Sequence, residues 1–364
     1  MSLARPLPRI AQSIGANDWA MVRTVVVITT GGTIASTSAS SGAKVASVAG
    51  ATLTSGLSTP QGVTVRVVDV LNRNSYALDF ADMDRIRSAI HQVLTAPDIC
   101  GVVVTHGTDT LEETAMLVEL LHADERPVVF TGAQLSHDDP ATDGPRNLAD
   151  AIAAAASAQA RGLGVLVCFA GVLHAAYGTR KVHNSAPSAF GDPAHRPLGT
   201  VLGPDRVQIT GVPRRGGPVA CRNLALADTR VDIVAVYPGA DATAIEAHMA
   251  QGAHGIVLEA TGCGNANAAI TAAVGRWTRA GRHVVLSSRV PSGPVRPVYG
   301  GGGGGVDLVA AGAVPAGQLR PGQARILLAT LIAAGRTHHE IADAFAAEPG
   351  SRRVNSPAPA EPMP

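Results

Sequence analysis

The feature that most constrains the fold is the stretch TVVVITTGGTIAS at residues 24–36. Its β-branched run, Val25 to Ile28, is typical of a strand covered on both faces in a parallel sheet. The two glycines that follow, Gly31 and Gly32, allow a sharp turn and a close approach by another molecule. Thr33 is therefore expected just beyond the carboxyl end of the strand, where open α/β sheets bind ligands. For this stretch alone, a turn followed by a capping threonine is an equally good interpretation.

The same arrangement recurs along the chain. The run CGVVVT at 100–105 ends in His106-Gly107-Thr108-Asp109, and a helix is predicted from Leu111. Strand-like and helical runs alternate around it, which predicts a doubly wound, mostly parallel sheet. The other strands are expected at 63–70, 127–131 and 164–169, and the helices at 78–94 and 146–160.

A second alternation predicts a smaller C-terminal α/β domain. Its strands are expected at 232–237, 255–259 and 283–287, and its helices at 242–251, 267–280 and 321–334. Between the two domains, residues 178–228 are rich in Pro, Gly and Arg and are expected to be irregular with short strands. Residues 36–62 are rich in small residues and are expected to form a long mobile loop, which often serves as a lid.

These patterns divide the chain into five parts. We expect an unstructured extension at 1–22, with Met21 as a possible true start, and a larger N-terminal α/β domain at 23–212. A linker at 213–230, a C-terminal domain at 231–347 and a disordered tail at 348–364 follow. The larger domain is expected to be the catalytic one.

Composition excludes several partners. The formal net charge is +1, so charge gives no reason to expect nucleic acid or an anionic membrane surface as a partner. No apolar run approaches the roughly 20 residues of a membrane span, and residues 1–23 do not have the pattern of a signal peptide. The four cysteines lack the spacing of a zinc or redox site. Together these features favour a reducing cytoplasm.

Lysine is rare, since Lys44 and Lys181 are the only lysines in the sequence. A lysine that survives among so many arginines is a candidate for a role that requires losing a proton, which arginine cannot do. We expect Lys44, in a loop of small residues, to be an ordinary solvated charge. Lys181 is the candidate for chemistry, although a surface charge is about as good an interpretation before composition is considered.

Two threonines follow glycines at the ends of the two buried strands, Thr33 and Thr108, and parallel strands end at the same edge of a sheet. A threonine hydroxyl is a weak nucleophile that needs a base or a proton relay. Asp109 and Lys181 are the partners of the right kind. The alternative for Thr108-Asp109 is a cap for the following helix.

Here the motifs carry a resemblance. The chain resembles the bacterial-type L-asparaginase family over about residues 24–335. The motifs, in chain order, are TTGGTIAS at 29–36, VVVTHGTDTLEETA at 102–115, FTGAQ at 130–134, DGPRNLADAI at 143–152, KVHNSAPSAF at 181–190, GNAN at 264–267 and SSRVPSG at 287–293.

The resemblance implies two α/β domains and hydrolysis of the asparagine side-chain amide, and often of glutamine, without a cofactor or metal. Thr33 matches the attacking threonine, and Thr108, Asp109 and Lys181 match a proton-relay triad. In the family the aspartate also holds the substrate α-ammonium group. Further substrate-binding positions are Ser75 for the α-carboxylate, Ala133 for a backbone contact, and Tyr76, which stands where many members have Gln or Glu.

Asn267 matches an asparagine contributed across a subunit interface, so the resemblance implies a homodimer or a homotetramer. Two features of the family are missing. Residues 36–62 contain no lid tyrosine, and residues 289–305 contain no acidic residue to match the neighbour's glutamate. Tyr76 and Tyr299 are the candidates to replace this arm of the site.

Three rival interpretations remain open. One is the asparaginase-like subunit of a glutamyl-tRNA amidotransferase, which supplies ammonia to a partner. Another is a non-catalytic amino-acid-binding module on the same fold. The third is a nucleotide-binding domain, which the sequence disfavours because TGGTIAS lacks the GxGxxG pattern.

Overall fold

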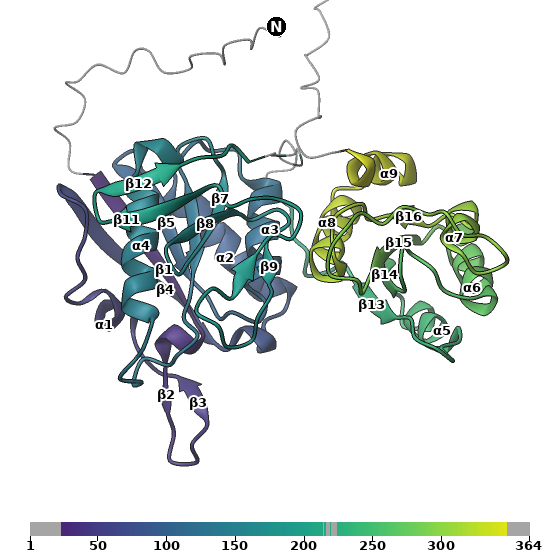
Figure 1. Ribbon diagram of the computed structural model, residues 1–364, viewed down its shortest axis with the longest axis horizontal. Coiled ribbons are helices and arrows are strands. Elements are labelled where there is room, and N and C mark those ends of the chain that lie inside the picture. Colours follow the sequence, from purple (N-terminus) through teal and green to yellow (C-terminus); the bar gives the residue numbers. More distant parts are fainter. Residues whose placement is uncertain (1–22, 214, 216–218, 220–223, 348–364) are drawn as a thin grey trace, which may run out of the picture.

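The computed structural model describes residues 23–213, 215, 219 and 224–347. Figure 1 shows two α/β units, each built on its own sheet, which is the predicted fold class. The expected extension at 1–22 and tail at 348–364 lie outside the described residues, as does part of the expected linker at 213–230. The domain boundaries therefore remain predictions. The large sheet ends at Ile209, and the small sheet begins at Val231.

The larger sheet has eight strands in the order β12-β11-β8-β7-β6-β5-β1-β4. The last five in this order, β7 to β4, are parallel, and β8, β11 and β12 are antiparallel to their neighbours. The last two lie in the stretch at 178–228, where short strands were expected but not placed. The strands are β1 (Arg23–Gly31), β4 (Val63–Arg73), β5 (Ile99–Thr105), β6 (Val128–Thr131), β7 (Val165–Phe169), β8 (Val172–Ala175), β11 (Gly199–Gly203) and β12 (Arg206–Ile209).

Helices cover both faces of this sheet because successive strand residues point to opposite sides. Val25 and Val27 pack with α4 (Gly144–Ala156) and α1 (Gly50–Thr54) on one face. Val26 and Ile28 pack with α2 (Phe80–Val93) and α3 (Leu111–Leu121) on the other. All four β1 side chains are fully buried. The β-branched run therefore forms a strand that is buried on both faces, as predicted.

The smaller sheet has four parallel strands in the order β13-β14-β15-β16. They are β13 (Val231–Ala235), β14 (Gly255–Ala260), β15 (His283–Ser288) and β16 (Val314–Pro315). α5 (Thr243–Ala250), α6 (Ala268–Arg279) and α7 (Gly305–Ala310) pack around one core, and α8 (Pro321–Ala333) and α9 (His338–Ala346) contribute to another. The polyglycine run leads directly into α7, a helix that the sequence pattern did not predict.

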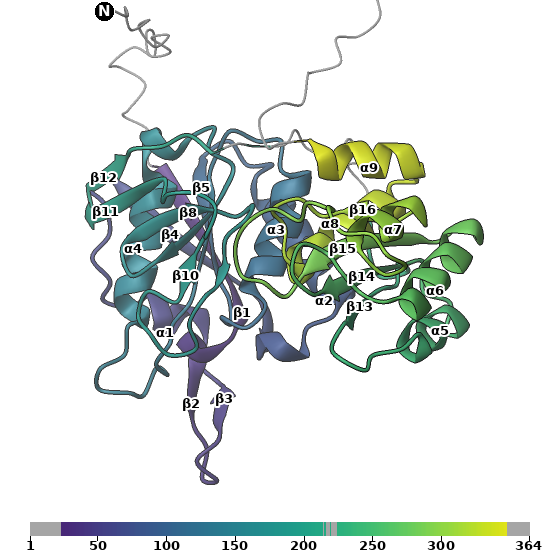
Figure 2. The same cartoon turned by 45° about the vertical axis from the view of Figure 1, so that its right-hand side comes forward.

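The two units meet through α3 and α8, which lie side by side in Figures 1 and 2. Met116 and Leu117 of α3 share one apolar cluster with Ile326 and Leu327 of α8. The guanidinium of Arg325 lies 4.3 Å from the centre of the Phe80 ring. This contact fixes the smaller unit close to the loops that follow β5.

The expected mobile loop at 36–62 contains regular structure. β2 (Ser36–Ser38) and β3 (Lys44–Ala46) form a hairpin that projects from the unit in Figure 2, and α1 follows it. Asp138 accepts hydrogen bonds from the Ser38 amide and hydroxyl and pairs with Lys44 Nζ at 3.2 Å. Lys44 is thus a tether for the hairpin and not only a solvated charge.

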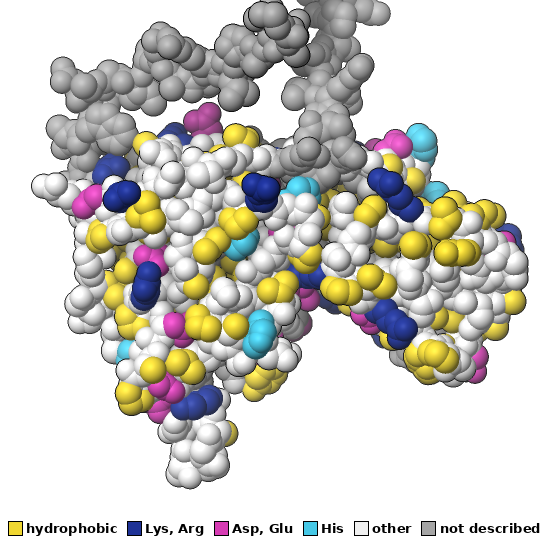
Figure 3. All heavy atoms as spheres, viewed as in Figure 1, with side chains coloured by type: hydrophobic (Ala, Val, Ile, Leu, Met, Phe, Trp, Pro, Cys, Tyr) yellow, Lys and Arg dark blue, Asp and Glu magenta, His cyan; other side chains and the backbone are white. Residues whose placement is uncertain are grey.

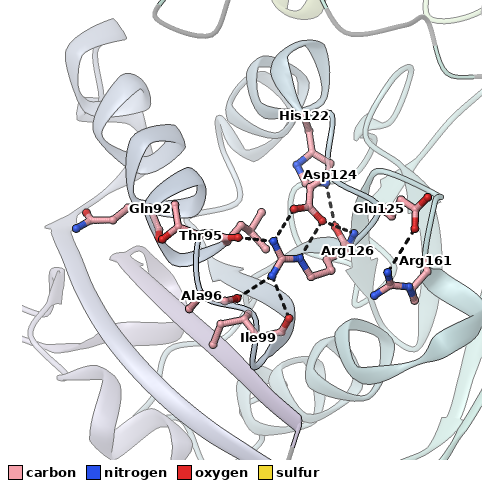
Figure 4. A network of polar contacts seen from close by, with 10 residues as sticks. Gln92, Thr95, Ala96, Ile99, His122, Asp124, Glu125, Arg126 and Arg161 are labelled. Atoms are coloured by element: carbon pink, nitrogen blue, oxygen red, sulfur yellow. Dashed lines mark hydrogen bonds and ion pairs between the residues drawn. The ribbon is translucent and has the colours of Figure 1, made fainter. Parts of the chain in front are cut away.

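At the amino-terminal ends of β5 and β6, Arg126 bonds several backbone segments to one another (Figure 4). Its guanidinium donates to the carbonyl oxygens of Leu94, Ala96 and Ile99 and pairs with Asp124. These bonds join the end of α2 to the starts of β5 and β6. Arg126 therefore holds together the segments at the amino-terminal ends of these strands.

Of the helices within the described residues, none has the length and apolar character needed to cross a bilayer.

Candidate active site

Backbone packing brings the loops after β1 and β5 into direct contact. Gly32 has φ +81°, and a Cβ there would lie 2.4 Å from the Gly107 backbone. Only glycine fits a left-handed conformation at such a distance. Thr33 and Thr108 follow these two glycines, so the contact sets the two threonines at one edge of the sheet. Thr33 is half-buried and Thr108 is 5% exposed.

Ser75 joins the same contact from the loop after β4. It begins the short 3-10 helix η3 (Ser75–Ala77) and is 3% exposed. A Cβ on Gly107 would lie 2.6 Å from Ser75 Oγ, so the missing side chain makes room for the serine. Thr110 Oγ1 donates to the Ser75 carbonyl at 2.9 Å. The serine is therefore held against the loop that carries Thr108 and Asp109.

Lys181 reaches this edge from outside the sheet. It lies on β9 (Arg180–Lys181), which pairs with β10 (Phe190–Gly191) in a small antiparallel ladder. Lys181 Nζ lies 2.9 Å from Thr108 Oγ1 and 2.7 Å from Asp109 Oδ1. Its side chain is 16% exposed, while that of Asp109 is 53% exposed. One lysine thus contacts a nearly buried hydroxyl and an open carboxylate, a geometry that suits proton transfer.

Glu112 fixes the backbone of this lysine. Its Oε2 accepts a hydrogen bond from the Lys181 backbone amide at 2.5 Å. Burial and the neighbouring Glu113 carboxyl raise the pKa of Glu112 above its ordinary value. This contact was not predicted from the sequence. The available signal was a pair of acids opening an otherwise apolar helix.

Ala133 lies in the loop after β6 and is fully buried. The Asp143 carboxylate accepts hydrogen bonds from the backbone amides of Gln134 and Leu135, and Asn147 Nδ2 donates to the Gly132 carbonyl. These bonds hold the loop on both sides of Ala133. Asp143, which begins the DGPRNLADAI motif, therefore helps to hold this part of the site.

His106 precedes the site but faces the core. It is fully buried, its Nδ1 lies 2.8 Å from the Gly107 carbonyl, and burial lowers its pKa to about 4. The imidazole is therefore neutral near pH 7 and carries no charge into the site. Within the described residues, no three His, Cys, Asp or Glu side chains are grouped to hold a metal ion.

Comparison with known proteins identifies the family. Residues 24–213 match the family model "Asparaginase, N-terminal", and residues 230–345 match "Glutaminase/Asparaginase C-terminal domain". The chain belongs to the asparaginase family. A relative from Deinococcus radiodurans named probable L-asparaginase is 36% identical over 78% of this chain and 86% of its own length.

Two further relatives place the chain within this asparaginase family. The crystal structure of a probable cytoplasmic L-asparaginase from Campylobacter jejuni matches with a TM-score of 0.78 and 26% identity, over 89% of this chain and 99% of that one. A glutamyl-tRNA(Gln) amidotransferase subunit from Halobacterium salinarum is 33% identical, over 63% of this chain and 56% of its own length.

The two tyrosines nominated for the missing arm of the site are both exposed in the chain. Tyr76 is 71% exposed, and its hydroxyl accepts a hydrogen bond from Asn74 Nδ2 at 3.0 Å. Tyr299 lies in the smaller unit and is 61% exposed. Neither hydroxyl is brought to Thr33 by a contact within the described part of the chain.

Asn267 has a structural role of its own. It caps α6, with its Oδ1 accepting from the Ile270 amide at 3.0 Å and its Nδ2 donating to the Ala240 carbonyl at 2.7 Å. Sequence spacing alone did not reveal this cap. The alternative of a cap at Thr108 or Asp109 was wrong, since Thr110 holds the N-cap position of α3 and its side chain makes no capping hydrogen bond.

The Gly32–Gly107 contact predicts a specific sensitivity. Gly32→Ala should lower the free energy of unfolding by about 3 kcal/mol or more, because strain at positive φ adds to a clash with backbone. Gly42 is the matched control, since it has φ +80° and nothing within 4 Å of an added Cβ. Gly42→Ala should cost only about 1 kcal/mol. Urea unfolding of both variants measures the difference, and equal losses would contradict the packing argument.

Proposed function

We propose that this chain hydrolyses the side-chain amide of L-asparagine to L-aspartate and ammonia. The observation that carries the proposal is the position of Lys181 Nζ, between Thr108 Oγ1 at 2.9 Å and Asp109 Oδ1 at 2.7 Å. This triad lies at the carboxyl edge of the sheet, where Thr33 follows the turn at Gly32. Family membership supports the reaction class, and the site residues match the motifs of that family.

In the proposed mechanism the Thr33 hydroxyl attacks the amide carbon. A carbon–oxygen bond forms, the hydroxyl proton passes to the relay, and the amide nitrogen leaves as ammonia after receiving a proton. Water then attacks the resulting ester, which releases aspartate and restores the hydroxyl. Lys181, held between Thr108 and Asp109, is the group that takes and returns the proton.

Substrate recognition is assigned to the groups around the threonines. The Ser75 hydroxyl would bind the α-carboxylate, and the exposed Asp109 carboxylate would bind the α-ammonium group. The backbone at Ala133 would contact the amide, with Tyr76 at the open side. A glutamine side chain is one methylene longer and would have to fit between the same contacts to its α-groups and its amide. We therefore propose asparagine as the preferred substrate and glutamine as a second one.

The leading alternative is an ammonia-supplying amidotransferase subunit, because such a subunit is among the relatives. Two observations favour the free hydrolase. The Deinococcus relative named probable L-asparaginase matches at 36% identity over 78% of this chain, against 33% over 63% for the halobacterial amidotransferase subunit. Basic and acidic side chains are interspersed on the face drawn in Figure 3, whereas a tRNA-binding face needs a clustered positive field. A non-catalytic binding module remains the second alternative, and loss of turnover in the variants below separates it from an enzyme.

We also propose a cytoplasmic homo-oligomer, at least a dimer. The Campylobacter relative is named cytoplasmic. Cys100, Cys168 and Cys263 are free thiols, as a reducing compartment would keep them. Cys168 is buried, Cys100 is half-buried and Cys263 is exposed.

The first prediction concerns the reaction and its nucleophile. The purified protein should release ammonia from asparagine without ATP, metal or a partner. Thr33→Ala should fold normally and lose turnover on the order of a thousandfold, because the attacking oxygen is gone. A coupled ammonia assay with both amides, alongside circular dichroism, makes the measurement. Near-normal activity in a folded Thr33→Ala protein would remove Thr33 from the mechanism.

The second prediction concerns the relay. Lys181→Arg keeps the positive charge but cannot give up a proton, so kcat should fall about a hundredfold or more. Lys44→Arg is the control, because it makes the same chemical change at the hairpin ion pair with Asp138 and should leave kcat within about twofold. Substantial activity in Lys181→Arg would mean that Lys181 only balances the charge of Asp109.

The third prediction concerns assembly. If Asn267 completes the site of a neighbouring subunit, mixing inactive Thr33→Ala with inactive Asn267→Ser subunits should restore activity. Serine retains a helix cap but lacks the amide, so the variant isolates the contact from the cap. Random exchange should return up to about a quarter of wild-type activity, because half of the dimers each contain one intact site. No recovery after verified exchange would mean that each chain builds its own site.

A further inference from the structure

A buried glutamine links the smaller unit to the segment that carries the site lysine. Gln323 lies in the first turn of α8 and is 3% exposed. Its Nε2 lies 2.8 Å from the Ala176 carbonyl oxygen and 2.9 Å from that of Thr179, and its Oε1 accepts from the Gly178 amide at 2.8 Å. One side chain from α8 therefore fixes the backbone that leads into β9.

The same amide also reaches the helix that follows the triad loop. Gln323 Nε2 lies 3.2 Å from the Glu112 carbonyl oxygen, in the first turn of α3. The Glu112 carboxylate in turn holds the Lys181 backbone amide. Gln323 thus bridges the two backbone segments that must keep a fixed separation if Lys181 Nζ is to contact Thr108 and Asp109.

The turn before β9, which Gln323 contacts, has little free space around it. Gly178 has φ +90°, and a Cβ there would meet the Asp192 carboxylate at 2.5 Å, so the turn before β9 is confined by its neighbours. The lysine itself is a flexible four-carbon stem. A displacement of about 1 Å in such a group costs on the order of a hundredfold in rate. The backbone beneath Lys181 therefore needs anchors that do not move.

We propose that Gln323 is a positioning residue, through which the C-terminal unit sets Lys181 relative to Thr108 and Asp109 within a single chain. The inference rests on the proposed function, since it concerns the same relay. It adds a second role for the C-terminal unit that does not depend on a subunit interface. Gln323 touches no reacting atom and acts only through the backbone at 176–181 and at Glu112.

The test uses the full-length protein and the asparagine ammonia assay. Gln323→Met retains length and apolar packing but removes all four contacts. It should lower kcat by about tenfold or more with KM changed less than about threefold, because the relay moves while Ser75 stays in place. If Gln323→Met does not fold, Gln323→Asn, with its amide withdrawn by one methylene, gives the same comparison.

A rescue variant separates positioning from general packing. Three carbonyl oxygens surround Nε2, whereas an amide group has only two hydrogens to donate. The ammonium of Gln323→Lys carries three donors, so it should satisfy the Ala176, Thr179 and Glu112 carbonyls and recover most of the kcat lost in Gln323→Met. Failure of this rescue while Gln323→Lys is folded would count against positioning through these carbonyls.

The control for loosening between the units is Arg87→Gln. Arg87 Nη2 donates to the Leu224 carbonyl at 2.7 Å, which ties α2 to the segment before β13 and away from β9. This variant should lower the unfolding midpoint and leave kcat unchanged. An equal loss of kcat in Arg87→Gln and Gln323→Met would overturn the proposal in favour of a general interface effect.

A double-mutant cycle completes the test. In a Lys181→Met background, Gln323→Met should cause no further loss, because the residue it positions is absent. Additive losses would overturn the inference. If the wild-type protein releases no ammonia, the proposed function fails first, whereas an active wild type with a fully active Gln323→Met removes only this inference.

Discussion

The site depends on a backbone-to-backbone contact between Gly32 and Gly107. Because Gly32 has no side chain, the loops after β1 and β5 approach to a distance that a Cβ on Gly32 would prevent. Ser75 occupies the remaining space beside Gly107, so three strand ends converge at one point. The parallel sheet supplies the common edge, and the glycines supply the close approach. Without this contact, the two loops that carry Thr33 and Thr108 would be farther apart.

Lys181 belongs to a second half of the site, which is held outside the large sheet. The threonines are set by a buried sheet, whereas the lysine arrives on a two-residue strand outside it. Its position is fixed from two directions, by Glu112 at its own amide and by Gln323 at the turn before it. In the proposed mechanism, a rigidly held Thr33 and a separately anchored Lys181 suit a reaction that moves the same proton twice.

Sequence patterns predicted what local composition can encode. The strand at Val25–Ile28 follows from β-branching, the shared edge follows from parallel alternation, and Lys181 stood out because lysine is so rare in this chain. The hairpin at β2–β3 was missed because its residues are mostly small and pair only through tertiary context. Short strands were expected in the stretch that holds β11 and β12, but their bounds could not be placed from local pattern. Gln323 could not be found in this way, because its partners lie 144 to 211 residues away in the sequence.

The most direct test of the account is the identity of the acylated residue. Wild-type protein mixed with asparagine and quenched in acid within the first turnover should be mapped by peptide mass spectrometry, with a burst of ammonia as the check that an intermediate accumulates. The account predicts an aspartyl ester on the peptide that contains Thr33. An ester on the peptide that contains Thr108, or an ammonia burst with no ester on Thr33, would contradict it.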